Sequence, residues 1–172
     1  MKKNTATPLR NATPPQTMMR LRSHTASTGI QLSRCTPHQR WRVVDHLQRD
    51  ARRHGVARGR LDFPSFWHDL GAIAAAPLLY AAVDARGRLV GYAVLEGEET
   101  ALYIPTLEIL PSHRRRGVGA TVVRLVADLA RERGWRRLRL RPVNGSEGFW
   151  ARMGFRVVDD GSHRTGSWAL EV

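Results

Sequence analysis

Three arginines and two glycines stand close together at residues 113–120, in the order His-Arg-Arg-Arg-Gly-Val-Gly-Ala. The apolar spacing predicts a strand before this segment and a long helix over 117–133 after it. A helix start has unpaired N–H groups and a partial positive charge, so acidic or hydroxyl side chains are usual there. Here cations take that place, and the first acid of the helix is Asp128. Each misplaced charge costs a few tenths to about 1 kcal/mol, a conflict that a bound polyanion would remove.

Gly117 and Gly119 carry no side chain, so an anion could approach their backbone amides closely. The spacing is not that of a Walker phosphate loop, because G-x-x-x-x-G-K-[ST] is absent, and this turn holds no G-x-G-x-x-G. R-x-x-G-x-G occurs by chance, and a solvated arginine cluster beside a glycine turn is the alternative. The strand before it and the helix after it favour phosphate binding.

The elements that position this turn follow from hydrophobic period and turn residues. Thr36-Pro37-His38-Gln39 predicts a capping box at the start of a helix that ends near Gly55. Pro105 cannot donate to a ladder, so it predicts an edge or a bulge in its strand. The remaining predictions are strands at 30–33, 78–83, 89–95, 101–110, 138–143, 155–158 and 167–172, and helices at 64–75 and 146–153.

Residues 1–28 form a basic tail rich in Ser, Thr and Pro, and residues 29–172 form the folded domain. The tail has no apolar period, so it cannot offset its ordering entropy. A start codon at Met18 or Met19, a targeting segment and a solvated tail are its three interpretations, and we favour the first or the last. With no apolar run long enough for a membrane span and one cysteine, Cys35, we expect a cytoplasmic protein.

The formal net charge is +13, and residues 1–34 contribute six basic side chains and no acid to it. Lysine occurs only at positions 2 and 3, an arginine bias that points to a GC-rich, bacterial genome more than to phosphate recognition. Nucleic acid is disfavoured as a partner, because no zinc-finger pattern and no aromatic-rich basic strand accompanies the charge.

Residues 30–172 resemble the GNAT superfamily of acyl-CoA N-acyltransferases. The resemblance rests on the strand 107–111, on the Arg114-x-x-Gly117-x-Gly119-Ala120 turn, and on Asn144 followed by the aromatic ending at 148–155. It implies an α/β fold with a mixed, centrally splayed sheet in the order β-α-α-β-β-β-α-β-α-β-β.

The resemblance implies acetyl-CoA as acyl donor, with pantetheine between two splayed parallel strands and pyrophosphate on the arginine turn. The donor-binding residues it implies are Ile109, Leu110, Arg114, Arg115, Arg116, Gly117, Val118, Gly119, Ala120, Asn144 and Trp150. The implied reaction is direct attack of a primary amine on the thioester in a ternary complex.

The catalytic residues we expect are Glu108 and Trp150. Glu108 is the only acid in the strand beside the expected acyl site, with Tyr103 and Glu147 as weaker candidates. Trp150 stands where many family members have a tyrosine acid, and an indole N–H is not a useful acid. Core packing with Phe149 and Met153 is the alternative for Trp150.

The histidines and the cysteine give no sign of a metal site or of a nucleophile. The seven histidines lack metal-ligand spacing, so we expect no metal. His113 is interpreted as structural or phosphate-side, and nothing near Cys35 supports a nucleophile. The alternatives to an enzyme are a catalytically silent acyl-CoA-binding module and a basic RNA- or ribosome-associated protein.

The positive charge of the arginines at 52–60 favours an acidic acceptor or a negatively charged carrier. This expectation rests only on the sign of the charge. A small amine metabolite, an aminoacyl group and a protein N-terminus all stay open. So does a homodimer, and no membrane partner is expected.

Overall fold

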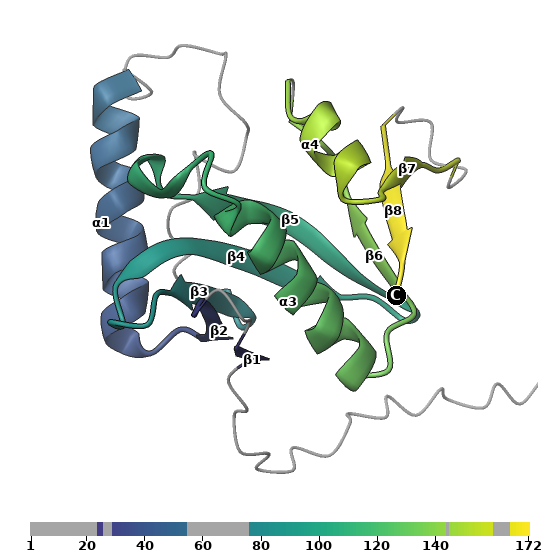
Figure 1. The fold of residues 1–172 in the computed structure, drawn as a ribbon, viewed down its shortest axis with the longest axis horizontal. Coiled ribbons are helices and arrows are strands. Elements are labelled where there is room, and N and C mark those ends of the chain that lie inside the picture. The colour runs from purple at the N-terminus through teal and green to yellow at the C-terminus, as the bar shows by residue number, and fades with distance from the viewer. Residues whose placement is uncertain (1–23, 26–28, 55–75, 144, 160–165) are drawn as a thin grey trace, which may run out of the picture.

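The computed structural model describes residues 24–25, 29–54, 76–143, 145–159 and 166–172 (Figure 1). Its helices are α1 (Pro37–His54), α3 (Val118–Glu132) and α4 (Glu147–Arg152), with a 3₁₀ turn η3 at Pro111–His113. Its strands are β1 (His24–Thr25), β2 (Gln31–Arg34), β3 (Leu79–Val83), β4 (Leu89–Gly97), β5 (Ala101–Ile109), β6 (Arg137–Leu140), β7 (Arg156–Val157) and β8 (Trp168–Glu171).

The described strands form one eight-stranded sheet in the order β1-β2-β3-β4-β5-β6-β8-β7. Its neighbours run antiparallel except β5 and β6, which are parallel. The β5–β6 ladder joins residues 101–103 to residues 137–139. Beyond it β5 continues to Ile109 while β6 ends at Leu140, and the two strands diverge (Figure 1). The predicted mixed sheet with a central splay is confirmed.

Helix α1 begins with the predicted capping box. The backbone N–H of Gln39 donates to Thr36 Oγ1 at 3.2 Å, and the N–H of Thr36 donates to Gln39 Oε1 at 2.9 Å. Pro37 is the first helical residue, where its missing N–H costs nothing. Local bonds therefore fix where α1 starts.

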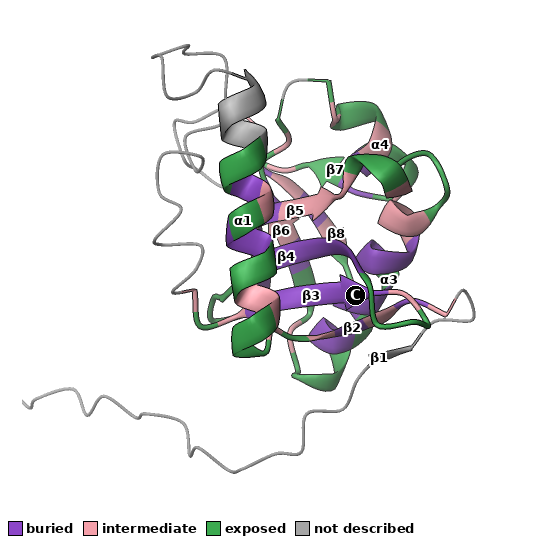
Figure 2. Ribbon diagram, turned by 90° about the vertical axis from the view of Figure 1, so that its left-hand side faces the viewer, coloured by how far each residue is buried: buried purple, intermediate pink, exposed green. Residues whose placement is uncertain are grey.

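Each face of the sheet carries its own apolar core. On one face α1 packs Val43 and Leu47 into a cluster with Tyr92 of β4. On the other face α3 packs Val122 into a larger cluster with Leu102 of β5. Figure 2 shows the buried strands β3 and β4 behind α1. The sheet therefore separates the two helices, and its central strands have one side facing α1 and the other facing α3.

Strand β5 carries one extra residue at positions 104–105, so it is bulged. In its register with β4, Val94 lies opposite Thr106. Two residues further along β4, Glu96 lies opposite Tyr103, which is three residues back along β5. The bulge predicted from Pro105 is therefore confirmed.

The bulge changes which face the later side chains of β5 occupy. Successive side chains of a strand alternate between faces. Leu102 and Ile104 belong to the α3 core, and Leu107, an odd number of positions further on, also packs against it. Glu108 lies directly opposite Tyr92 and therefore shares the α1 face. Without the extra residue, Glu108 would share a face with Leu102.

Two elements differ from the sequence prediction. Residues 24–25 were predicted as part of the tail but form β1, which pairs antiparallel with β2. Such an edge pairing needs only backbone groups, so no apolar period marks it. The predicted strand at 138–143 ends at Leu140, and Val143 is exposed. The helix predicted at 64–75 lies outside the described residues.

We predict that Gly91→Ala lowers the free energy of unfolding by about 1–3 kcal/mol, because the backbone of β5 would have to move. A Cβ at Gly91 would lie 2.6 Å from the carbonyl oxygen of Glu108 and 2.9 Å from Cδ1 of Ile109. Urea unfolding followed by circular dichroism measures the effect. The control is Gly148→Ala in α4, whose Cβ would meet Arg152 at 3.6 Å and which should change stability by about 0.5 kcal/mol or less. Equal losses from the two variants would contradict the close approach of β4 and β5.

Candidate active site

The arginine turn leads from β5 into α3 through two left-handed residues. Arg115 has a φ of 60°, and Gly117, the N-cap of α3, has a φ of 76°. The first turn of α3 contains no acid, and no side chain caps it. The N–H of Thr121 donates to the carbonyl of Gly117 at 3.1 Å, so the amides of residues 118–120 have no acceptor within the helix. The predicted glycine turn at a helix start is confirmed.

Gly119 brings three elements together at this helix start. A Cβ there would lie 3.3 Å from the ring of Phe149 in α4 and 3.6 Å from Cγ1 of Ile109 in β5. The missing side chain is therefore a packing requirement as well as room for an anion. Because of it, the start of α3, the end of β5 and α4 are in direct contact.

The last part of β5 turns the backbone groups of alternate residues away from β4, toward the splay. The N–H of Leu110 donates to the carbonyl of Val90 in β4 at 2.9 Å. Backbone groups alternate in direction along a strand, so those of Ile109 and Leu107 point away from β4. Of the two predicted contacts, Ile109 thus turns its N–H to the splay, but its carbonyl accepts from Arg114 Nε at 2.8 Å, and the N–H of Leu110 is used within the sheet.

Glu108 gathers three donors on the α1 face of the sheet. The hydroxyl of Tyr92 donates to its Oε2 at 2.6 Å. Nε2 of His46 and a guanidinium nitrogen of Arg114 each lie 3.2 Å from its Oε1. The Arg114 Nε also donates to the carbonyl of Ile109 at 2.8 Å. Helix α1, strand β4 and the arginine turn therefore meet at one carboxylate.

The pKa of Glu108 is lowered in this environment. Burial raises the pKa, but hydrogen bonds from His46 and Tyr92, with the charges of His46 and Arg114, lower it further than burial raises it. The side chains of His46 and Glu108 are only 15% and 13% exposed. Glu108 is therefore held as a carboxylate near neutral pH, which makes it a strong hydrogen-bond acceptor and a weak proton acceptor.

Sequence reasoning missed His46 and Tyr92. His46 follows Val43 by three residues and precedes Leu47 by one, so it lies on the buried side of α1. A polar residue in the apolar stripe of a helix was the available signal. A search for metal-ligand spacing among the histidines does not detect it, because its partner lies 62 residues away in sequence.

Trp150 lies in the core beneath the splay. It is 8% exposed and makes edge-to-face contacts with Phe149 at 5.0 Å and Phe155 at 5.2 Å between ring centroids. Packing is therefore one role of this side chain, with Phe155 as a partner that the sequence did not indicate. A contact with the acyl donor stays a prediction. Asn144 lies outside the described residues.

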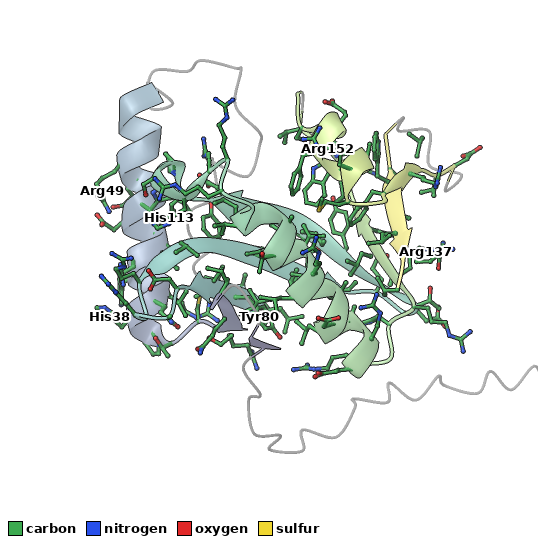
Figure 3. All side chains as sticks on the ribbon, in the orientation of Figure 1. His38, Arg49, Tyr80, His113, Arg137 and Arg152 are labelled. Atoms are coloured by element: carbon green, nitrogen blue, oxygen red, sulfur yellow. The ribbon has the colours of Figure 1, made fainter. Side chains whose placement is uncertain are left out.

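The remaining candidates take no part in the Glu108 cluster. Glu147 is exposed in the first turn of α4, and Tyr103 lies at the other end of β5 from Glu108. His113 ends the η3 turn between β5 and α3, as Figure 3 shows. Burial raises the pKa of the Cys35 thiol to about 11, against a lowering by Arg40, so the thiol stays protonated and is a poor nucleophile.

The described residues contain no group of three or more His, Cys, Asp or Glu side chains that could hold a metal ion. None of their helices has the length and apolar character needed to cross a membrane.

The profile of the acetyltransferase (GNAT) family matches residues 41–155, and the chain belongs to this family. Membership supports acyl-CoA-dependent acetyl transfer in general terms. The chain is also similar to a streptothricin acetyltransferase from Streptomyces lavendulae, with 39% identity over 67 residues, 38% of this chain. It spans only 35% of the length of that relative.

Solved structures share the fold at low sequence identity. A GNAT-family acetyltransferase from Listeria monocytogenes has 13% identity and a TM-score of 0.65, with 88% of this chain and 100% of that chain covered. The PaiA N-acetyltransferase of Thermoplasma acidophilum, solved in complex with coenzyme A, has 13% identity and a TM-score of 0.59. The alignment with it covers 83% of this chain and 99% of that chain.

We predict that Glu108→Gln lowers the free energy of unfolding near neutral pH and that this loss shrinks as the pH falls. A lowered carboxyl pKa stabilises the fold above the ordinary carboxyl range, and that stabilisation disappears as the pH falls through the lowered value. Urea unfolding of both proteins from about pH 7 to about pH 3 measures the difference. Asp45→Asn is the control, because this exposed carboxylate of α1 pairs with exposed Arg49 and should matter little at any pH. A loss that grows toward acid would contradict the lowered pKa.

Proposed function

We propose that this chain is an N-acetyltransferase that moves the acetyl group of acetyl-CoA onto a primary amine by direct attack, with both substrates bound together. One observation carries the proposal: the unpaired backbone of β5 and the uncapped start of α3 meet where β5 and β6 diverge. The family to which the chain belongs, and the coenzyme A bound to one relative of the same fold, support it.

The start of α3 would hold the pyrophosphate of acetyl-CoA. The amides of residues 118–120 have no acceptor within the helix and no side-chain cap among the described residues, and they stand at the positive end of the helix. Arg115 and Arg116 are exposed beside them. Arg114 differs, because its guanidinium already contacts Glu108 and the carbonyl of Ile109. We therefore assign Arg115 and Arg116 to the phosphates and Arg114 mainly to positioning the turn.

The free edge of β5 would hold the pantetheine arm. Pantetheine carries amide groups, and an extended chain with amides can add to a sheet edge through backbone hydrogen bonds. Leu107 and the N–H of Ile109 offer such groups on the side where β6 has diverged, whereas the carbonyl of Ile109 is held by Arg114. Asn144, which follows β6, keeps the pantetheine role that the family resemblance implies.

The chemistry requires a neutral amine, a route for its proton and a leaving thiolate. The phosphates would lie next to Ile109, so the extended arm would carry the thioester back along β5 toward Leu107 and the bulge, with the buried Glu108 cluster on the α1 face of this stretch. Trp150 cannot supply a proton in the way a tyrosine can, so the thiolate would leave unassisted or with a proton from water. CoA thiolate tolerates this near neutral pH, and the reaction would be slow rather than absent.

The acceptor is best sought by assay. The similarity to a streptothricin acetyltransferase makes streptothricin the first amine to test. The arginine side chains at 52–60 that favoured an acidic acceptor lie outside the described side chains. A silent acyl-CoA-binding module and an RNA-associated protein stay the alternatives, and no contact among the described residues favours either. Cytoplasmic location, bacterial origin and self-association stay predictions.

We predict that acetyl-CoA stabilises the fold by about 2.7 kcal/mol at a concentration about 100 times Kd, and that Arg116→Glu weakens its binding about 10–100-fold. Isothermal titration and thermal unfolding measure the two effects. Arg124→Glu is the matched control, since Arg124 is exposed on the same helix two turns further on and should leave binding nearly unchanged. No binding by the wild-type protein would overturn the proposed function, and equal effects of the two charge reversals would place the phosphate elsewhere.

We predict that Trp150→Tyr keeps acetyl-CoA binding and leaves kcat equal or higher, because a phenol can protonate the departing thiolate. Trp150→Phe is its matched control, differing from it only by the hydroxyl. Trp150→Ala should cost about 3–5 kcal/mol of stability through lost contacts with Phe149 and Phe155 and should weaken binding. Steady-state kinetics and thermal unfolding measure these effects. A severe loss of kcat in Trp150→Tyr, with affinity unchanged, would show that the indole itself acts in the reaction.

A further inference from the structure

His46 is a polar residue on the buried side of α1. It lies between Val43 and Leu47, both fully buried. Its Nε2 lies 3.2 Å from Oε1 of Glu108, the one hydrogen-bond partner of this ring within the described residues. The side chain of His46 is 15% exposed, and its second ring nitrogen, Nδ1, makes no hydrogen bond within the described residues.

The charge of Glu108 decides which nitrogen of His46 carries the hydrogen. An ionised carboxylate only accepts hydrogen bonds, so a neutral imidazole must donate to it from Nε2. Nδ1 then holds the lone pair and is the nitrogen that can take up a proton. A carboxylate that fixes the tautomer and orientation of a histidine is the arrangement found in acyl-transfer triads.

Glu108 is better suited to orient a base than to act as one. The Tyr92 hydroxyl holds its Oε2 at 2.6 Å, and Arg114 holds its Oε1 at 3.2 Å. Both donors stabilise the Glu108 anion, so they fix its position and make it a weaker base. The imidazole that shares Oε1 with Arg114 is therefore the proton acceptor that this cluster presents.

The cluster lies at the end of β5 where the acyl donor is expected. Glu108 immediately precedes Ile109, whose backbone faces the splay. Arg114 contacts both residues, so the carboxylate and the strand edge are joined through one guanidinium. A group held by Glu108 on the α1 face is thus near the end of the strand edge proposed for pantetheine.

The charged groups around His46 come from three elements. Tyr92 and Glu108 face it from the sheet, and Arg114 faces the shared carboxylate from the turn. On α1 itself, Arg42 and Arg49 are one turn away, and the second of these pairs with Asp45. The single carboxylate in contact with the ring is therefore Glu108, among the residues whose side chains are described.

We propose that His46, oriented by Glu108, accepts the proton of the acceptor amine, an inference that rests on the acetyl transfer proposed above. The amine nitrogen forms a bond to the thioester carbonyl carbon, and its proton moves to Nδ1 of His46. The C–S bond breaks and the thiolate leaves with the electron pair. The imidazolium returns the proton to solvent or to the thiolate, so the products are an acetamide and CoA thiol.

The decisive comparison is His46→Gln against His38→Gln. Glutamine can still donate to Glu108 but cannot take up a proton, and His38 is exposed near the start of the same helix (Figure 3). With acetyl-CoA and streptothricin or a primary-amine panel, we expect His46→Gln to lose about 10²–10⁴-fold in kcat. The Kd for acetyl-CoA should not change. His38→Gln should match the wild-type protein in both.

A second measurement does not depend on a folded variant or on the acceptor. In the ¹⁵N spectrum of the full-length wild-type protein, recorded at a pH high enough for the ring to be neutral, His46 should show a protonated Nε2 and an unprotonated Nδ1. The Glu108→Gln protein should lose this preference for one tautomer. A protonated Nδ1 in the neutral ring of the wild-type protein would overturn the proposal.

The outcomes separate the two proposals. If acetyl-CoA does not bind, or if it binds and no amine is acetylated, the proposed function fails and the role of His46 falls with it. If the wild-type protein turns over and His46→Gln stays within about threefold of it in kcat, acetyl transfer stands and His46 is not its base. A loss in His46→Gln alone, with binding kept, supports both proposals.

Discussion

The arrangement of this protein depends on one extra residue in β5. The bulge at positions 104–105 turns the end of the strand by one side-chain position, so that Glu108 faces α1 and Leu107 faces α3. In an unbulged strand Glu108 would enter the apolar core beside Leu102, where an unpaired carboxylate costs several kcal/mol. The same bulge lies where β5 separates from β6. One irregularity therefore accounts for both the splay and the polar cluster beside it.

The two sides of the β5 end consequently carry different chemistry. Toward the splay lie backbone amides and the uncapped start of α3, which suit a ligand with amide groups and phosphates. On the α1 face lies a carboxylate held by Tyr92, His46 and Arg114, which suits the handling of a proton. Arg114 belongs to both, because it bonds the Ile109 carbonyl and Glu108 at once. An acyl donor and a proton acceptor would thus meet at a single point of the sheet.

Local signals in the sequence were sufficient for most of the fold. The Thr36–Gln39 capping box and the glycine turn before α3 depend on residues within four positions of one another, and both formed as predicted. The bulge also had a local signal, because Pro105 cannot join a ladder. The pairing of His46 with Glu108 had none, since it spans 62 residues and depends on which faces of α1 and β5 meet. The edge strand β1, made by backbone pairing alone, was missed for a related reason.

In the structure, fewer arginines contribute to the charge conflict at the start of α3 than the sequence predicts. Of the three consecutive arginines, Arg114 turns back to Glu108 and is neutralised within the fold. Among the described residues no carboxylate pairs with Arg115 or Arg116, and Arg115 also holds a left-handed backbone that a residue other than glycine rarely adopts. Strain and unpaired like charge at an uncapped helix start oppose stability, so selection for stability alone would not retain them. The strain and the like charge are both explained if an anion occupies this turn in the working protein. Acetyl-CoA binding would supply that anion.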